Sequence, residues 1–304
     1  MERETPFWRT SPFWLLMAIL GLVAALIFLG DRYRDVTVGM EIVPKVMARK
    51  AAALSAMRIN MVKSAEAEKR AVMADTDEAS VSFAGESLRA AEAVELNLGE
   101  LAGLIEKYPS GKEEDLIREF GVCWAEFREI DRQVLDFAVQ NTNLKAARLS
   151  FGAGHAAVRQ FELELSRLTR DTPSGPICRL VNDAQTAALR INVLHAPHIA
   201  SPDDGEMDDI EKAIRENDAV VKRSLSEIKP LLPSEKKATL QLAAAAYEAF
   251  MEITARVVEL SRQNTNIKSF ELSMNRKRKT TAQCDEILTS LQDAVQSRSF
   301  KATR

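Results

Sequence analysis

The chain has 304 residues, of which 46% are apolar and only 6% aromatic, with 12 Gly and 10 Pro. This composition is poor in turn formers, so it favours long helices and argues against a strand-rich fold. Its 41 Lys and Arg against 44 Asp and Glu leave a net charge of -3 without a basic stripe, which excludes nucleic acid as the expected partner.

An uncharged run lies near the N-terminus. Thr10 to Gly30 are 21 residues without a charge, about the length that a helix needs to cross a hydrocarbon core. We therefore predict a short tail at 1–11, a transmembrane helix at 12–30 and a helical sensory domain at 31–304. A cleaved signal peptide is the alternative, but the run is long and lacks a small-x-small cleavage site. A count of flanking basic residues would place the large domain in the cytoplasm, a rule that weakens for long domains.

Three helices are expected after the span. The first runs from Ile42 to about Met73 with apolar residues at helical spacing. The second extends from the break at 75–77 to about Lys107, and the turn at 108–111 contains a capping box that opens the third. The third carries a heptad ladder at Phe120, Cys123, Phe127, Ile130, Val134, Phe137 and Asn141.

The heptad ladder continues after Asn141 with a defect. It resumes at Leu144, Ala147, Phe151, Gly154, Val158, Phe161, Leu165 and Leu168. The steps from Asn141 to Leu144 to Ala147 are three and three, which is a slip in the hydrophobic phase. Either the seam changes partners there or the helix breaks.

After a turn at 171–176 the same order starts again. Ala-Met-Arg-Ile-Asn at 56–60 matches Ala-Leu-Arg-Ile-Asn at 188–192, and Gln-Asn-Thr-Asn-Leu-Lys at 140–145 recurs as Gln-Asn-Thr-Asn-Ile-Lys at 263–268. We predict a helix from Pro176 to His195, a loop that includes Ala196-Pro197, a second helix to Lys229-Pro230 and a long third helix. The third repeats the ladder, with Ile267, Phe270, Met274 and Lys277 after the same slip at Asn264. Matching defects indicate duplicated helical units.

Two all-α architectures fit this repeat. In one, each Asn-Thr-Asn is a tight turn, and the chain forms two independent four-helix bundles in tandem. In the other, the long helices run through the motif and are shared by two stacked four-helix bundles. The proximal bundle would be 36–141 with 265–300, and the distal bundle 142–264. The stacked arrangement of six long helices is favoured, because neither copy of the motif contains Gly or Pro.

Stacked bundles would need a polar layer where they meet. The expected junction residues are Asn141, Asn143, Asn264 and Asn266. Asn141 and Asn264 would hydrogen-bond each other or water and fix the register of the helices.

An N-terminal anchor followed by duplicated helices, with two long ones shared by stacked bundles, resembles the helical bimodular sensory domain of methyl-accepting chemotaxis receptors. The Gln-Asn-Thr-Asn-(Leu/Ile)-Lys and Arg-Ile-Asn stretches look like that family and its single four-helix-bundle relatives. The resemblance covers roughly residues 32–295. It implies a single-pass protein of the bacterial inner membrane, with a cytoplasmic N-terminus and a periplasmic helical domain. The implied partners are a small organic anion or amino-acid-like ligand, and a second copy or a signalling protein.

The chain departs from that family after Val295. The nine remaining residues contain neither a second span nor a signalling hairpin. We therefore expect either part of a receptor or a module that acts through another protein.

An organic anion inside a bundle needs a cation at the level of the inner faces. The proximal set is Arg58 and Trp124, at similar heights, with Lys277 at a ladder position; the distal set is Arg190, Tyr247, His155 and Arg159. We expect these two sets to form ligand pockets. The alternative is that each arginine packs its stem on an aromatic ring and that Lys277 is solvated.

Two further clusters carry weaker signals. His195-Ala-Pro-His198 with Asp203, Asp204 and Glu206 could collect a divalent cation, but the proline disfavours a helical zinc pair, and we predict an acidic loop without a metal. Cys123 and Cys284 fall on ladder positions at similar heights. Buried unpaired thiols are favoured there over a disulfide.

The sequence shows no Ser/His/Asp set, nucleotide loop or inner carboxylate pair, so we predict neither an enzyme nor a cofactor. The expected function is a membrane-anchored, extracytoplasmic ligand sensor that relays a helix shift to the membrane or to a partner. A structural or adaptor protein of the cell envelope is the alternative.

Overall fold

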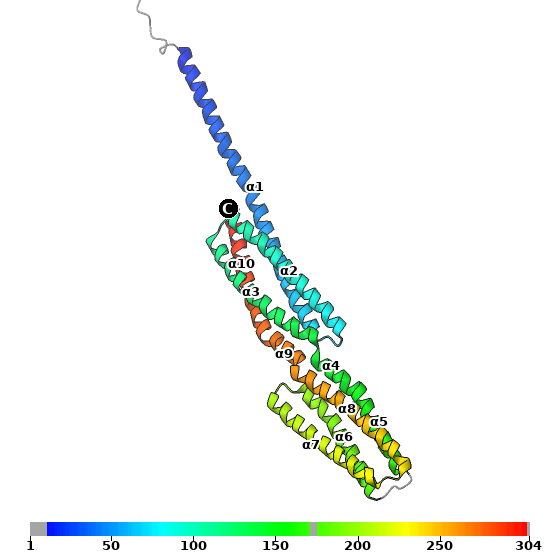
Figure 1. Ribbon diagram of the computed structural model, residues 1–304. Helices are drawn as coiled ribbons and strands as arrows, with labels where there is room; N and C mark the ends of the chain where they lie inside the picture. The colour runs from blue at the N-terminus through cyan, green and yellow to red at the C-terminus, as the bar shows by residue number, and fades with distance from the viewer. Residues whose placement is uncertain (1–10, 171–174, 303–304) are drawn as a thin grey trace, which may run out of the picture. The chain divides into compact units, whose positions relative to one another are not determined.

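The computed structural model describes residues 11–170 and 175–302, with side chains placed at 17–29, 45–170 and 175–297. Over these residues the chain is helical and contains no strand, so the all-α prediction is confirmed (Figure 1). The Cα positions divide into two compact units. Unit 1 comprises Met1–Met61, Glu92–Cys123 and Gln283–Arg304, and unit 2 comprises Val62–Ala91 and Trp124–Ala282.

Four long helices contribute residues to both units. They are α1 (Ser11–Val72), α2 (Asp77–Lys107), α3 (Gly111–Gln140) and α10 (Arg278–Ala302). Thr76 caps the N-terminus of α2, because its hydroxyl accepts a hydrogen bond from the Ala79 amide at 3.1 Å. Asp77 and Glu78 stand in the first turn of α2, where negative charge suits the helix dipole.

The part of the second copy that precedes its Asn-Thr-Asn motif lies wholly in unit 2. Its helices are α6 (Pro176–Ala200), α7 (Asp204–Ile228) and α8 (Lys237–Gln263), with short 3-10 turns at Lys229–Leu231 and Ser234–Lys236. The predicted loop at Ala196-Pro197 is wrong, because α6 continues through Pro197. The proline lies in the last turns, and its carbonyl still accepts a bond from the Ser201 amide at 2.9 Å.

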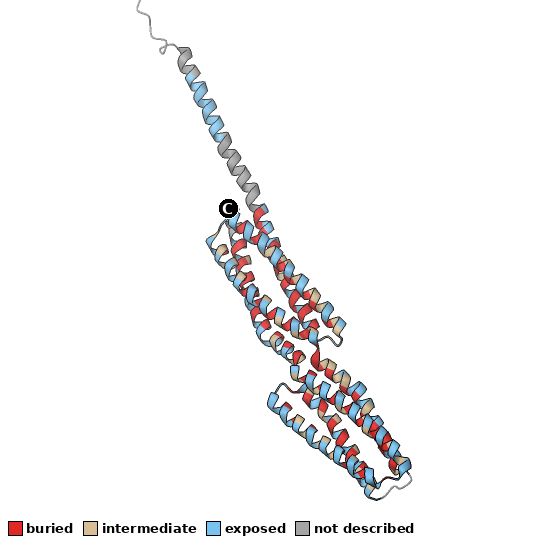
Figure 2. Cartoon of the chain, in the orientation of Figure 1, coloured by how far each residue is buried: buried red, intermediate tan, exposed pale blue. Residues whose placement is uncertain are grey.

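Four helices of unit 2 share one hydrophobic core. α5 (His155–Thr169) packs with α6, α7 and α8, and their buried faces appear as red stripes in Figure 2. The core includes Phe161, Leu165, Ile191, Ile214, Tyr247 and Phe250. Unit 1 buries a separate set on α1, α2, α3 and α10, which includes Met57, Leu101, Ile105, Phe120 and Leu291. Apolar burial of this kind supplies most of the stability of helices packed in water.

Single asparagines interrupt the two long segments that carry the repeated motif. Asn141 has φ 50° and ψ 40°, and Asn264 has φ 56° and ψ 32°. They are the only non-glycine residues with positive φ in the described part of the chain. Helices resume at once as α4 (Thr142–Leu149) and α9 (Thr265–Leu272). The expectation of unbroken helices was therefore wrong, because asparagine tolerates the left-handed conformation without help from Gly or Pro.

A π-helix follows each interruption at the same distance. These are η2 (Ser150–Gly154) and η5 (Ser273–Lys277). From each left-handed asparagine to the π-turn the buried face runs through Ser150, Ser269 and Ser273, and the extra residue of the π-turn returns it to the predicted ladder at Gly154 and Lys277. Phe151, Phe270 and Met274 are consequently exposed, by 72%, 51% and 40%. Those ladder positions were predicted one residue out of phase.

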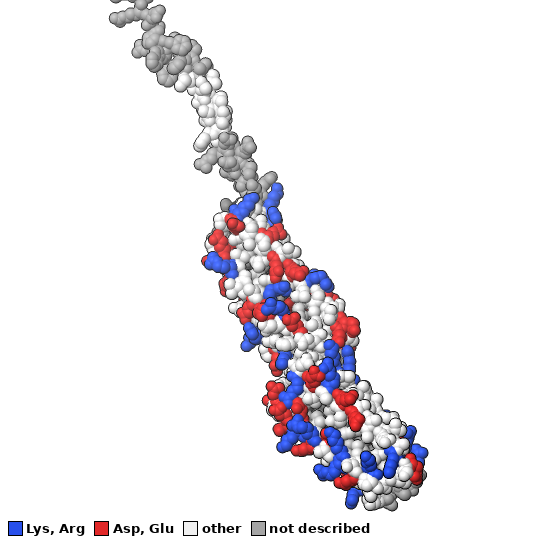
Figure 3. Space-filling view, viewed as in Figure 1, with Lys and Arg blue, Asp and Glu red and all other residues white. Residues whose placement is uncertain are grey.

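No helix within the described residues is both long and apolar enough to span a membrane. Residues 1–10 of the predicted tail, and the side chains of 11–16 and of residue 30, lie outside the described residues. Between Met17 and Leu29, every large apolar side chain is exposed. This stretch of α1 is uncharged in Figure 3, whereas Lys and Arg alternate with Asp and Glu over the rest of the face shown.

A disulfide joins α3 to α10 within unit 1. Cys123 and Cys284 are bonded, with their Cα atoms 5.7 Å apart. The preference for unpaired thiols was wrong, because similar heights on packed helices bring the two Cα atoms within the range that a disulfide requires. Cys178 remains a free thiol and is half-buried.

Removal of this disulfide should destabilise the protein. The bridge spans a sequence separation of 161 residues, so the Cys123→Ser/Cys284→Ser variant should lose about 2–4 kcal/mol of unfolding free energy. Urea denaturation measures the loss, and the Cys178→Ser variant is the matched control. Equal stability of the double variant and the control would contradict the prediction.

Candidate functional site

The two Asn-Thr-Asn motifs bind each other inside unit 2. The hydroxyl oxygens of Thr142 and Thr265 lie 3.1 Å apart. The Thr142 amide donates to the Thr265 hydroxyl at 3.1 Å, and the Thr265 amide donates to the Thr142 hydroxyl at 3.2 Å. Both residues begin a helix, where backbone amides have no partner in their own helix. Each helix start therefore caps the other.

The flanking asparagines extend this reciprocal pairing. Asn143 and Asn266 each donate a backbone amide to the side-chain oxygen of the other, at 3.1 and 3.3 Å. The Asn266 amide group donates to Asn141 at 3.0 Å, and that of Asn143 donates to Asn264 at 2.8 Å. The expected bond between Asn141 and Asn264 is not formed. The two motifs run in opposite directions, with Thr142 opposite Thr265. Asn141 therefore lies opposite Asn266, and Asn264 lies opposite Asn143.

Further bonds tie this junction to neighbouring elements. Asn141 donates to the Asp77 carboxylate at 3.1 Å, at the start of α2. Asn143 donates to the Ile199 carbonyl at 2.8 Å, and Asn264 donates to the Ser201 carbonyl at 2.9 Å. The junction therefore holds the C-terminal end of α6 through two backbone carbonyls.

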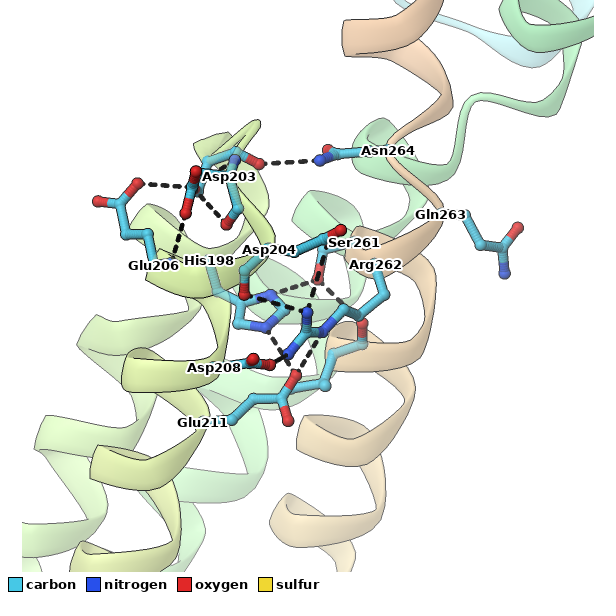
Figure 4. A network of polar contacts seen from close by, with 12 residues as sticks. His198, Asp203, Asp204, Glu206, Asp208, Glu211, Ser261, Arg262, Gln263 and Asn264 are labelled. Carbon is cyan, nitrogen blue, oxygen red and sulfur yellow. Dashed lines mark hydrogen bonds and ion pairs between the residues drawn. The ribbon is translucent and has the colours of Figure 1, made fainter.

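A polar network beside the junction joins α6, α7 and α8 (Figure 4). Nδ1 of His198 lies 2.6 Å from the Ser261 hydroxyl, and its Nε2 lies 3.3 Å from Glu211. The Arg262 guanidinium donates to the same Glu211 oxygen at 2.7 Å and also binds Asp208. Burial lowers the pKa of His198, with the Arg262 charge acting in the same direction and the Glu211 carboxylate opposing it.

The second buried histidine is held by hydroxyls alone. Nδ1 of His195 lies 3.0 Å from the Ser150 hydroxyl and Nε2 lies 3.1 Å from the Thr254 hydroxyl. Thr254 also donates to the Phe250 carbonyl at 2.9 Å, so it accepts from the imidazole, and Ser150 donates to the other ring nitrogen. Burial, with a smaller contribution from His198, lowers the pKa of His195 to about 4. This ring is neutral at pH 7.

The structure places the predicted proximal residues in internal contacts. In unit 1, Arg58 donates to Asp285 at 2.8 Å and to Thr289 at 2.6 Å, both on α10. In unit 2, the buried Trp124 ring stacks on Phe127, with centroids 4.5 Å apart. Arg58 therefore already binds a carboxylate of its own chain.

Lys277 is buried in unit 2 and is not solvated. Its ammonium lies 2.6 Å from Asp131 and 3.3 Å from the centroid of the Phe127 ring. Burial lowers the pKa of Lys277 to about 8, although Asp131 opposes the shift. Desolvation also raises the pKa of the buried Glu68. A ligand anion would have to displace Asp131 to reach this ammonium.

The distal residues are not brought together. The Tyr247 ring lies in the core against Phe161, and its hydroxyl donates to Asp218 at 2.9 Å. His155, Arg159 and Arg190 are exposed, and their side chains make no hydrogen bond or ion pair with the rest of the described chain.

Arg190 lies in a groove of ≈ 440 Å³ between α6 and α7. The groove is lined by Thr186, Leu189, Arg190, Val193, Leu194, Ala213 and Asn217, and its surface is mostly apolar. Leu189 and Val193 are exposed in it by 39% and 69%. An open apolar surface with one unpaired guanidinium suits a ligand that carries an anionic group on an apolar body.

The sequence did not reveal the network around His198. The His195-Ala-Pro-His198 segment was noted only as a possible cation site, and no cluster of three or more metal-ligating side chains occurs among the described residues. Ser261 and Arg262 carried no signal of their own. They precede the second motif directly, so their closeness to the junction was the available clue.

A comparison of the chain with protein-family models finds no matching family, and a comparison with curated protein sequences finds no match.

Burial of His195 should make stability depend on pH. Its folded pKa of about 4 lies below the unfolded value of 6.5, so the contribution of the neutral ring is complete above pH 6.5 and is lost as the pH falls towards 4. The loss amounts to about 3 kcal/mol of unfolding free energy. Chemical denaturation across this range should show a smaller loss in His195→Gln than in the wild type, the difference being the contribution of His195.

The exposed histidine provides the control for this measurement. His155→Gln should keep the full wild-type dependence of unfolding free energy on pH. An unchanged pH dependence in His195→Gln would contradict the assignment.

Proposed function

We propose that this chain is a membrane-anchored, extracytoplasmic sensory module of chemoreceptor type, which binds a small organic anion and relays a helix shift. The proposal includes the stacked arrangement of a proximal bundle, 36–141 with 265–300, and a distal bundle, 142–264. The bonds between the two copies of the motif support a shared junction, which independent tandem bundles would not require. Output would pass through a second copy or a signalling partner.

Two observations support the anchor and the compartment. Large apolar side chains from Met17 to Leu29 are all exposed, and a lipid bilayer would cover them in the way that the sequence pattern predicts. The bond between Cys123 and Cys284 suits an oxidising compartment such as the bacterial periplasm.

The availability of Arg190 is the observation that carries the ligand-binding proposal. Of the four Lys and Arg residues predicted for the pockets, Arg58 and Lys277 bind Asp285 and Asp131. Arg159 is exposed and does not line the groove. Arg190 has no such partner among the described residues and lines an apolar groove. A carboxylate could therefore bind its guanidinium without breaking an internal ion pair.

The same helix connects the groove to the junction. α6 carries Arg190 in its second half, and the carbonyls of Ile199 and Ser201 at its end accept bonds from Asn143 and Asn264. A ligand that draws α6 towards α7 would act directly on these bonds. Small shifts of one helix against its neighbours are an established way to transmit such a signal.

A structural or adaptor role is the second candidate, and the apolar lining of the groove favours it. Leu189 and Val193 are the kind of exposed side chains that accept the apolar face of a partner helix. In that role Val193→Asp would abolish capture of a partner, whereas small anions would not stabilise the protein.

Thermal unfolding of the full chain with a panel of mono- and dicarboxylates and amino acids tests the sensor proposal. A ligand at a hundred times its dissociation constant should add about 2.7 kcal/mol of stability. Arg190→Gln should weaken binding about tenfold or more, since a charge-assisted hydrogen bond is lost. Arg179→Gln, which changes another exposed arginine of α6, is the matched control.

Two outcomes would contradict the sensor proposal. The first is a panel in which no compound raises the melting temperature of the wild type. The second is a ligand whose stabilising effect survives unchanged in Arg190→Gln.

A further inference from the structure

Three basic side chains lie beside the Glu211 carboxylate: His198, Arg262 and Arg215, whose Nη1 lies 3.6 Å from Oε2. Oε1 of Glu211 accepts from Arg262 at 2.7 Å and lies 3.3 Å from Nε2 of His198. Glu211 is thus already ion-paired with a guanidinium that also binds Asp208. A second positive charge on the imidazole would be fully buried and would face Arg262 across the shared Glu211.

Ser261 lets the imidazole gain a proton without losing a hydrogen bond. Its hydroxyl lies 2.6 Å from Nδ1 of His198, and also 2.8 Å from the Val257 carbonyl. When His198 is neutral, Ser261 donates to Nδ1 while Nε2 donates to Glu211. When His198 is protonated, Nδ1 donates to Ser261, whose hydrogen turns to Val257. The hydrogen bonds therefore do not decide between the two states, and the cost of protonation lies in burying the charge.

The charged groups facing His198 come from each helix of the network. Glu211 on α7 favours protonation, and Arg262 on α8 opposes it. On α6 the neighbouring His195 is itself neutral at pH 7, and protonation of either ring disfavours protonation of the other. Asp208 and Asp204 face Arg262 and not the imidazole. Desolvation together with Arg262 outweighs the attraction of Glu211.

We propose that His198 is a proton sensor, whose protonation loosens α6 from α8 and weakens the junction bonds at Ile199 and Ser201. The junction residues Asn143 and Asn264 donate hydrogen bonds to these two carbonyls, which lie one and three residues after His198. The packed arrangement of α6 against α8 favours the neutral His198 ring. A fall in pH therefore favours, by linkage, the arrangement in which α6 has moved away from α8. This regulation is independent of the ligand proposed for the groove, since it needs only the network itself.

Histidine titration by NMR on the full chain tests this proposal. The chain has only three histidines, so substitution of each assigns its Hε1 signal. We expect the pKa of His198 to lie below 6.5. Glu211→Gln should lower it and Arg262→Gln should raise it, each by about one pH unit. Arg256→Gln, which changes an exposed arginine of the same helix, should leave it in place.

Hydrogen exchange measures the consequence for α6. After correction for intrinsic rates, amides in the last turn of α6 should exchange severalfold faster at pH 5 than at pH 7.5. His198→Gln should remove this difference, whereas His195→Gln should retain it. Exchange that does not depend on His198 would overturn the sensor.

The wild-type titration decides the proposal even where a variant fails to fold. A His198 pKa at or above 6.5 in the native protein would overturn it. So would a pKa that neither Glu211→Gln nor Arg262→Gln moves, because the shared carboxylate would then have no influence on the proton.

Discussion

The reciprocal capping of Thr142 and Thr265 is the interaction on which the rest of unit 2 depends. A left-handed asparagine ends each long helix, and the next helix begins one residue later in a buried position. A buried helix start without partners for its amides would be costly. Here the two starts satisfy each other at 3.1 and 3.2 Å, so neither interruption is stable without the second copy of the motif.

The π-helices follow from the same constraint. Each interruption shifts the phase of the buried face, and the extra residue at Ser150–Gly154 and Ser273–Lys277 restores it. Matched buried polar pairs result on the two sides of the junction. Asp131 of the first copy binds Lys277, and Thr254, which follows Asp131 by 123 residues, binds His195. The two pairs are built on equivalent positions, Asp131 and Thr254, but the first is an ion pair and the second is uncharged.

Much of the fold was predictable from the sequence, because helical composition, turns and an internal repeat are local signals. The positions of both interruptions were also visible, since the ladders slip at Asn141 and Asn264. The sequence could not show the helix break and the later π-turn as two events, because each shifts the phase of the same hydrophobic ladder. That is why Phe151 and Met274 were expected to be buried and are exposed.

The candidate site was less predictable, because the role of a cation depends on which carboxylate lies beside it. Arg58 and Lys277 were predicted to line ligand pockets, but in the structure they form ion pairs with Asp285 and Asp131. Arg190 and Arg159 have no such neighbour among the described residues, and only Arg190 lines the groove. The spacing of residues in the sequence does not show which carboxylate will lie beside a given cation. The same holds for His198, whose behaviour depends on Glu211 being shared with Arg262.

The most direct test of this account is a double-mutant cycle between Thr142→Val and Thr265→Val, measured by chemical denaturation of the full chain. Reciprocal capping predicts a coupling energy of about 1 kcal/mol between the two substitutions. Strictly additive losses of stability would contradict it, because they would mean that the two copies of the motif do not touch.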